Sequence, residues 1–233
     1  MTDFAAVSVV VPCFRCAATV RRAVASVGAQ TLRPRELILV DDASGDGTLA
    51  VLRTIAQEAG DWVKVIALAS NAGAASARNT GWEQATQPYI AFLDADDAWH
   101  PQKIEIQYGY LREHPEIVLC GHLCRQLPPQ ASGPLQWPLA ALAVQKVTWI
   151  GLLLRHQFVT PSVMLRRTIA PRFTPGLRHM EDHRLWLDIV GQGVPVVKLQ
   201  VELAAVFKPV YGASGLSADM WGMERAELAN YLY

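Results

Sequence analysis

Short apolar runs alternate with helix-like segments along the first half of the chain. Apolar runs with the character of buried strands cover residues 7–11, 36–40, 62–68 and 89–93. Helices are expected between and after them, over residues 19–30, 49–59, 71–85 and 101–113. Strands that are apolar throughout and alternate with helices predict an α/β fold, in which a mostly parallel sheet is covered on both faces.

The second half of the chain is less regular. Residues 127–138 form a proline-rich connection, and residues 158–166 are expected to return to the sheet. Short helices are predicted over 147–155 and 181–191, and one or two short strands over 195–208. Because no polar linker interrupts the chain, we expect a single domain over residues 1–233, with a regular half (1–115) and a less regular half (116–233).

Composition narrows the class of protein. Of the 233 residues, 51% are hydrophobic, and 21 basic residues balance 21 acidic ones, which is typical of a globular chain without the positive charge that nucleic acid attracts. No apolar stretch approaches the roughly 20 residues of a transmembrane segment. The N-terminus also lacks the basic-then-apolar pattern of a secretory signal, so a cytoplasmic location is expected.

Four cysteines raise the question of a metal or redox site. Cys13 and Cys16 have the spacing of such a pair, and Cys120 and Cys124 have three residues between them. In a reducing compartment we expect free, mostly buried thiols, with a zinc site or a redox dithiol as minor alternatives.

Carboxylates gather where the predicted strands end. Asp94, Asp96 and Asp97 follow the strand 89–93, and Asp41 and Asp42 follow the strand 36–40. The carboxyl ends of parallel strands share one edge of a sheet, which is where ligands bind. Closely spaced carboxylates suit Mg²⁺ or Mn²⁺. We therefore expect the first group to face a metal and a diphosphate and the second to face a nucleoside. A solvated acidic loop is the alternative for either segment alone.

Two familiar nucleotide motifs are absent. No Gly-x-Gly-x-x-Gly follows the first strand, and no Gly-x-x-x-x-Gly-Lys-Ser/Thr occurs, which excludes a dinucleotide fingerprint and a P-loop. Arg78, in the segment Asn71–Asn79, could contact phosphate or form an ordinary salt bridge on a helix surface.

A second acidic site lies at the start of the predicted helix 181–191. Asp182 shares a helical face with Leu185, Trp186 and Ile189. A carboxylate at the head of an apolar stripe is partly buried, and burial can raise its pKa toward that of a useful base. The alternative is that Glu181 and Asp182 only complement the helix dipole.

Together these motifs resemble those of family 2 glycosyltransferases, which have the GT-A fold. The resemblance rests on the segments 7–12, 39–48, 71–81 and 89–97, which occur in order, and on the Glu181-Asp182-x-x-Leu-Trp segment. It implies inverting transfer of a sugar from a nucleoside diphosphate to an acceptor hydroxyl. The half 1–115 would then bind the nucleotide sugar, and the half 116–233 would hold the acceptor and the catalytic base.

The resemblance also implies roles for individual residues. Asp182 corresponds to the catalytic base, with Glu181 as its rival. Asp96 corresponds to the main ligand of a divalent cation, Mn²⁺ or Mg²⁺, assisted by Asp94 and Asp97. The nucleotide sugar would contact a wider set of residues: Pro12, Phe14, Asp41, Asp42, Arg78, Asp94, Ala95 and Lys208. Cys13-Phe14 replaces the family's usual Tyr-Asn, and Lys208 is a substitute for a later contact of the family that is only loosely matched.

The sequence indicates the class of enzyme more closely than it indicates the donor and the acceptor. By resemblance a UDP-sugar is the commonest donor, and a saccharide, a lipid-linked intermediate or a peptide can be the acceptor. Peripheral association with the inner membrane face stays open, although no basic amphipathic helix is evident. Two other functions compete: a degenerate domain that only binds nucleotide sugars, and a sugar nucleotidyltransferase. The latter normally needs a glycine-rich basic loop after the first strand, where this chain has Cys13–Ala18.

Overall fold

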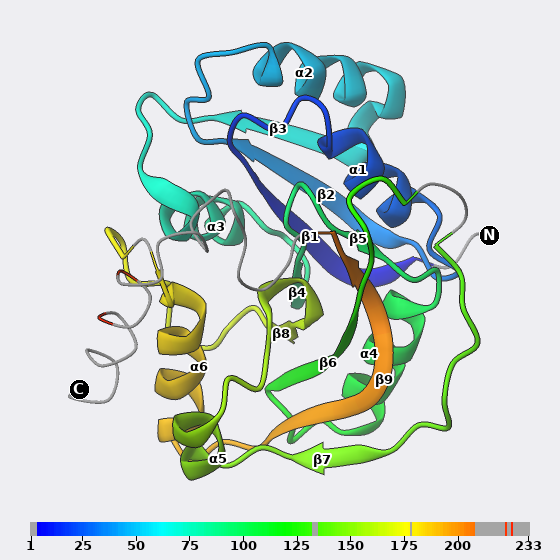
Figure 1. Cartoon of the computed structure of the whole chain (residues 1–233), viewed down its shortest axis with the longest axis vertical. Coiled ribbons are helices and arrows are strands. Elements are labelled where there is room, and N and C mark those ends of the chain that lie inside the picture. The colour runs from blue at the N-terminus through cyan, green and yellow to red at the C-terminus, as the bar shows by residue number, and fades with distance from the viewer. Residues whose placement is uncertain (1–3, 132–134, 178, 208–221, 223–224, 226–233) are drawn as a thin grey trace.

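A computed structural model describes residues 4–131, 135–177, 179–207, 222 and 225 (Figure 1). Lys208 lies outside the described residues, so its predicted contact is not addressed by the structure. The sheet has the strand order β3-β2-β1-β4-β8-β6-β9-β5, and β7 pairs with β9.

The first half is the predicted alternation of strands and helices. Its parallel strands are β1 (Ala5–Cys13), β2 (Pro34–Asp41), β3 (Val63–Ala67) and β4 (Tyr89–Phe92). Its helices are α1 (Val20–Gly28), α2 (Thr48–Ala59) and α3 (Gly73–Glu83), with a 3₁₀ turn at Gly60–Trp62.

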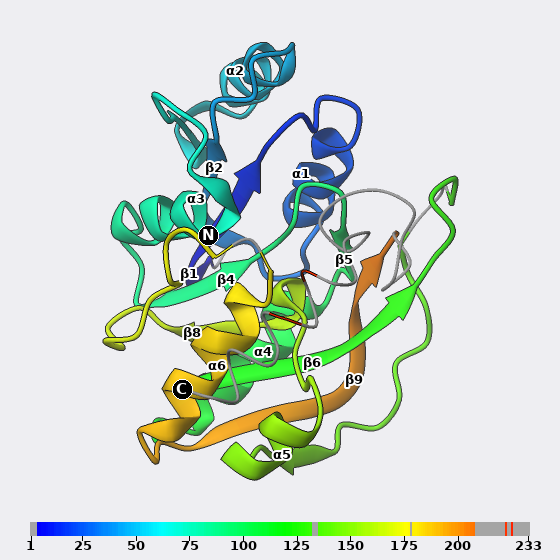
Figure 2. The same cartoon turned by 60° about the vertical axis from the view of Figure 1, so that its left-hand side comes forward.

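The second half extends the same sheet with mixed strand directions. Its strands are β5 (Ala98–Trp99), β6 (Leu119–Gln126), β7 (Val144–Lys146), β8 (Met164–Arg166) and β9 (Val196–Val206). Its helices are α4 (Lys103–Glu113), α5 (Trp149–Leu154) and α6 (Glu181–Gly191), with a 3₁₀ turn at Thr160–Ser162. β8 runs antiparallel between β4 and β6 and so joins the two halves, while β9 bends along β6 (Figure 2).

Several details differ from the sequence-based expectation, and the short strands β5 and β7 were not predicted. β6 was not predicted, because Gly121, His122 and Arg125 interrupt its apolar pattern. The region 195–208 holds one strand of 11 residues rather than short pieces. β1 also continues through Pro12 to Cys13 instead of ending before it.

Proline is tolerated in β1 because of where its missing N–H would point. The carbonyl of Val10 accepts a hydrogen bond from Leu93 on the β4 side, and the carbonyl of Cys13 accepts one from Asp42 on the β2 side. Alternation along the strand turns Pro12 toward the β4 side, past the last β1–β4 pair at Val10 and Phe92. No ladder hydrogen bond is therefore lost there.

Two apolar layers cover the sheet. One face packs against α1, α2 and α4, and the other against α3, α5 and α6. β1 contributes to both, since Val9 and Val11 lie in the first layer and Val10 in the second. This two-sided burial explains why the central strands carry unbroken apolar runs, Val9–Val11 in β1, Leu37–Val40 in β2 and Tyr89–Phe92 in β4.

Helix α3 packs closely on the sheet because residue 81 has no side chain. A Cβ at Gly81 would lie 2.4 Å from Cγ1 of Val10 and 3.2 Å from Cγ2 of Val40. The close approach of this Ala-rich helix to the sheet thus depends on a glycine.

Gly81→Ala should destabilise the protein by about 1–3 kcal/mol, because the added methyl forces α3 away from β1. Gly109→Ala is the matched control: Gly109 is also helical, and its Cβ would meet nothing within 4 Å. That variant should be neutral or up to about 1 kcal/mol more stable. Denaturant unfolding measures both, and equal stabilities would contradict the packing argument.

Candidate active site

The ends of three parallel strands bring the predicted site residues to one edge of the sheet. Cys13 is in register with Asp41, and Val10 with Phe92. The loops after β1, β2 and β4 therefore begin side by side. This is the edge at which an open parallel sheet binds ligands.

The acidic segment after β4 forms a tight turn. The N–H of Asp97 donates to the carbonyl of Asp94 at 3.0 Å, and Arg22 of α1 donates to the carbonyl of Asp96 at 2.5 Å. Asp97 is buried and accepts the N–H of Phe207 at 3.4 Å. Elements from both halves of the chain thus fix the turn, and Ala95 is buried within it.

Arg78 joins this turn to the second acidic site. Its Nη2 donates to Oδ1 of Asp94 and its Nη1 to Oε1 of Glu181, both at 2.8 Å. The guanidinium is buried and also lies 5.3 Å from the centre of the Phe173 ring. It is therefore not an ordinary surface salt bridge, because it connects α3, the acidic turn and α6 across 103 residues of sequence.

Asp182 is held from several sides at the start of α6. One carboxylate oxygen accepts the hydroxyl of Thr160 at 3.1 Å, and the other accepts the N–H of His183 at 2.7 Å. Nε2 of His156 lies 3.7 Å from that second oxygen. The carboxylate is half-buried, as the helical pattern predicted.

The two neighbouring carboxyl groups differ in acidity. Burial opposes ionisation of Asp182, but its contact with His156, the charge of Arg78 and the N–H of His183 lower the pKa of Asp182 below its usual range. Burial raises the pKa of Glu181, and Arg78 offsets this only in part. The expectation that the pKa of Asp182 rises is therefore wrong: the raised pKa belongs to Glu181.

Asp41 and Asp42 are buried and anchor neighbouring loops. Asp42 accepts the N–H groups of Ala72 and Gly73 at 2.7 and 2.9 Å, as well as the side-chain amide of Asn71 at 2.9 Å. Asp41 accepts the hydroxyl of Ser44 at 2.5 Å. Their predicted contacts with a nucleoside stay a prediction, whereas the contacts by which Asp42 fixes the start of α3, the helix that carries Arg78, are new from the structure.

Strained backbone lies next to the site residues. In the part of the chain that the structure describes, three non-glycine residues have positive φ: Arg15 (48°), Ala43 (50°) and Met180 (57°). Each directly follows or precedes a predicted site residue, namely Phe14, Asp42 and Glu181. Such conformations cost about 1–3 kcal/mol each and tend to occur at functional sites.

Comparison with known proteins identifies the family. The family model described as "Glycosyl transferase family 2" matches residues 8–160, which is well over half of the chain. The chain belongs to glycosyltransferase family 2. The chain is also 30% identical over 184 residues to the Escherichia coli protein "UDP-Glc:alpha-D-GlcNAc-diphosphoundecaprenol beta-1,3-glucosyltransferase WfgD", covering 79% of this chain and 69% of that one. The predicted class of enzyme, a glycosyltransferase, is thus confirmed, and the nucleotidyltransferase alternative is set aside.

Solved structures confirm the GT-A fold. The S. aureus protein TarS (residues 1–349), in complex with UDP-GlcNAc, aligns with a TM-score of 0.73 at 18% identity, over 97% of this chain and 66% of that chain. The Pyrobaculum calidifontis mannosyltransferase PcManGT, in complex with GDP-Man and Mn²⁺, aligns with a TM-score of 0.66 at 20% identity, over 89% of this chain and 58% of that chain. The chain therefore spans about two thirds or less of the length of these neighbours.

The acidic turn of this family 2 chain can be tested against the needs of a divalent cation. Within the described residues no group of three or more His, Cys, Asp or Glu side chains is placed to hold a metal ion. A cation that binds substrate phosphates usually takes only one or two protein carboxylates. Asp96 and the partly exposed Asp94 supply hard oxygen ligands of this kind, so the donor set fits.

The remaining predicted residues lie around the same loops. Phe14 is exposed after β1, and Pro12 is half-buried. The four cysteines are free, and three of them are buried. Sequence reasoning missed His156, Thr160 and Arg22, because single His, Thr or Arg residues outside a motif carry no signal of their contacts.

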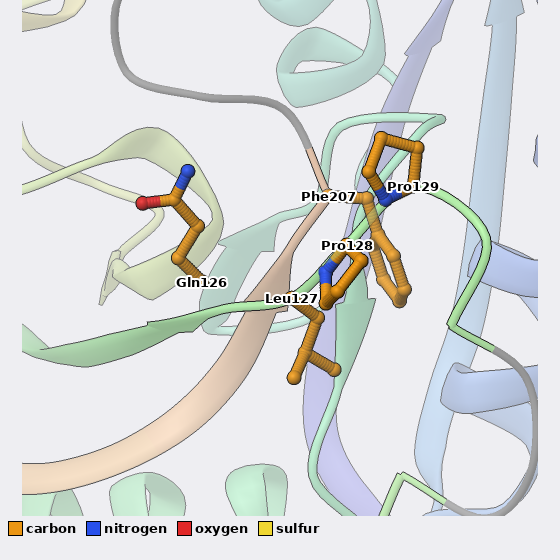
Figure 3. A pocket seen from close by; sticks show the side chains of 5 residues that line it. All are labelled: Gln126, Leu127, Pro128, Pro129 and Phe207. Carbon is orange, nitrogen blue, oxygen red and sulfur yellow. The ribbon is translucent and has the colours of Figure 1, made fainter.

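A pocket beside the acidic turn was also missed. It has a volume of about 360 Å³ and is lined by Gln126, Leu127, Pro128, Pro129 and Phe207. Figure 3 shows the rings of Pro128, Pro129 and Phe207 close together at the end of β6. Since the N–H of Phe207 is bound to Asp97, this apolar pocket borders the turn that carries the proposed metal ligands.

Arg78→Met should lower the free energy of unfolding by about 3 kcal/mol, since Asp94 and Glu181 lose their common cation. That value is at the low end for buried ion pairs, because the Asp94 side chain is 29% exposed. Arg21→Met, at the exposed pair with Glu58, is the control and should not change stability measurably. Urea unfolding compares the two, and similar losses would refute a special role for Arg78.

Proposed function

We propose that this enzyme transfers a sugar with inversion from a UDP-sugar to a hydroxyl group of a saccharide acceptor. The observation that carries the proposal is the double ion pair of Arg78. It holds the acidic turn, the proposed donor side, against the start of α6, the proposed acceptor side. Donor and acceptor groups would meet between these two segments.

The choice of donor rests on the named relatives. WfgD is named for a UDP-Glc donor, and TarS binds UDP-GlcNAc, whereas PcManGT binds GDP-Man. UDP is therefore the nucleotide that we propose for the donor. WfgD is named for an acceptor carried on diphosphoundecaprenol, so a lipid-linked saccharide is the acceptor we propose. A cytoplasmic location stays a prediction from the sequence.

Asp182 is the general base of the proposal. Asp182 is ionised at neutral pH and can therefore accept the proton of the attacking hydroxyl, although its lowered pKa makes it a weaker base than an ordinary aspartate. Thr160 and the N–H of His183 fix both carboxylate oxygens in direction. Glu181 remains the rival because its pKa is raised, but Oε1 of Glu181 is already bound by Arg78 at 2.8 Å. In this assignment Glu181 positions Arg78.

The acidic turn would hold a divalent cation, Mn²⁺ or Mg²⁺, through Asp96 with help from Asp94 and Asp97. When bound, the cation would offset negative charge on the departing diphosphate. Arg78 keeps Asp94 in place, and Arg22 and Phe207 fix the turn around Asp96 and Asp97. Asp41 and Asp42 would border the nucleoside through the loops that they anchor.

Asp182→Asn should lower the transfer rate by a factor of about 10²–10⁴ while UDP-sugar affinity stays the same, because only proton acceptance is lost. Asp188→Asn, on the same helix and paired with Arg184, is the matched control and should keep full activity. Steady-state kinetics and calorimetric titration measure both. Unimpaired turnover of Asp182→Asn would reject the assignment of the base.

Asp96→Ala should weaken donor binding and remove the effect of Mn²⁺ on it, because the main ligand of the cation is lost. Asp61→Ala, at an exposed 3₁₀ turn, is the control with the same change of charge. Titration calorimetry of UDP-sugar with Mn²⁺ and with EDTA compares them. Equal donor affinity of the unaltered protein in both conditions would contradict a metal site.

Slow hydrolysis of the UDP-sugar separates the enzyme from the alternative of a degenerate binding domain. An active site that aligns the donor for transfer also lets water attack it. Complete absence of UDP release over the whole range of donors, together with tight donor binding, would favour the degenerate domain.

A further inference from the structure

Apolar side chains are exposed together at the end of the molecule that holds α5 and β7. We define the α5–β7 surface by five residues: Leu142, Val144, Trp149, Ile150 and Leu154. Only two residues separate the end of β7 from the start of α5. Both elements lie along the lower edge of Figure 1, far from α2. Exposed apolar residues that cluster in this way mark an interaction surface.

The helix α5 presents apolar residues on two sides. Leu152 is buried against the core, whereas Ile150 and Leu154 are 65% and 82% exposed. These two residues are four positions apart and so share one face of the helix. They protrude into solvent, which is unusual for side chains that gain free energy by leaving water.

The part of the sequence that contains this surface is rich in basic residues. Between Glu116 and Glu181 the sequence has none of the protein's 21 acidic residues but seven of its 21 basic ones. They are Arg125, Lys146, Arg155, Arg166, Arg167, Arg172 and Arg178. Lys146 and Arg155 flank α5 and are exposed. The helix that packs against α5 carries three acidic residues: Glu181 is paired with Arg78 at 2.8 Å, Asp182 lies 3.7 Å from His156, and Asp188 is paired with Arg184 at 3.3 Å.

We infer that the α5–β7 surface docks on an anionic phospholipid bilayer. Protruding apolar side chains can enter the boundary between headgroups and acyl chains, while flanking cations attract the negative lipid surface. A second copy of the chain fits less well, because its own α5–β7 surface carries the same positive charge. None of the described helices is both long and apolar enough to cross a bilayer.

The proposed base lies next to the helix that carries this surface. Nε2 of His183 contacts the carbonyl of Leu152 at 3.0 Å, which ties α5 to the start of α6. His156, two residues beyond α5, lies 3.7 Å from Asp182. The surface and the base are therefore parts of one rigid unit. The docking itself does not depend on the proposed transfer reaction.

Vesicle sedimentation tests the inference with the full chain. The protein should sediment with vesicles of phosphatidylcholine and phosphatidylglycerol, less with phosphatidylcholine alone, and less at high salt. Ile150→Ser combined with Leu154→Ser should weaken binding about tenfold or more. Phe4→Ser, which removes an exposed apolar side chain near the N-terminus, is the control and should bind normally.

A pair of charge reversals tests the electrostatic part. Lys146→Glu should weaken binding to the anionic vesicles about fivefold or more and leave any binding to phosphatidylcholine unchanged. Lys64→Glu makes the same change on β3, far along the sheet, and should have no effect.

Three results would overturn the inference. The first is an unaltered protein that stays in the supernatant with anionic vesicles. The second is a Ile150→Ser/Leu154→Ser variant that binds as well as the unaltered protein, with melting curves showing that both are folded. The third is loss of self-association in that variant, measured by ultracentrifugation, without any change in vesicle binding. UDP release from the donor, measured without vesicles, reports separately on the proposed transferase activity.

Discussion

The buried guanidinium of Arg78 is the constraint on which the rest of the site depends. Two carboxylates from distant segments, Asp94 and Glu181, meet on it at 2.8 Å each. Burying several carboxylates in one small region costs free energy when their charges are unpaired. The positive charge of Arg78 offsets part of this cost. The acidic turn and the start of α6 are therefore held together before any substrate arrives.

The support of Arg78 comes from the sheet. Asp42, at the end of β2, binds the N–H groups that open α3, and Gly81 lets that helix lie directly on β1. Arg78 lies between these two fixed points. Ala43, which has a positive φ, lies in the loop after β2, so the parallel sheet holds there a conformation that the local sequence would not adopt alone.

The two halves of the chain contribute different parts of the site. The parallel strands of the first half supply the edge where nucleotide-binding loops begin, and the mixed strands of the second half bring in α6 and its two carboxylates. β8 lies between β4 and β6 and makes the two halves one sheet. The exposed α5–β7 surface of the second half is apolar and is flanked by Lys146 and Arg155, which suits the proposed docking on a membrane.

The sequence by itself determined the order of strands and helices in the first half, the helix 181–191 and the acidic motifs, because apolar periodicity and motif spacing are local properties. The tertiary structure decided which groups meet. It paired Arg78 with both acidic sites, surrounded Asp182 with His156 and Thr160, and thereby lowered the pKa of Asp182 rather than raising it. Acidity depends on every charge and donor within a few ångströms, and those neighbours are set by packing between distant segments.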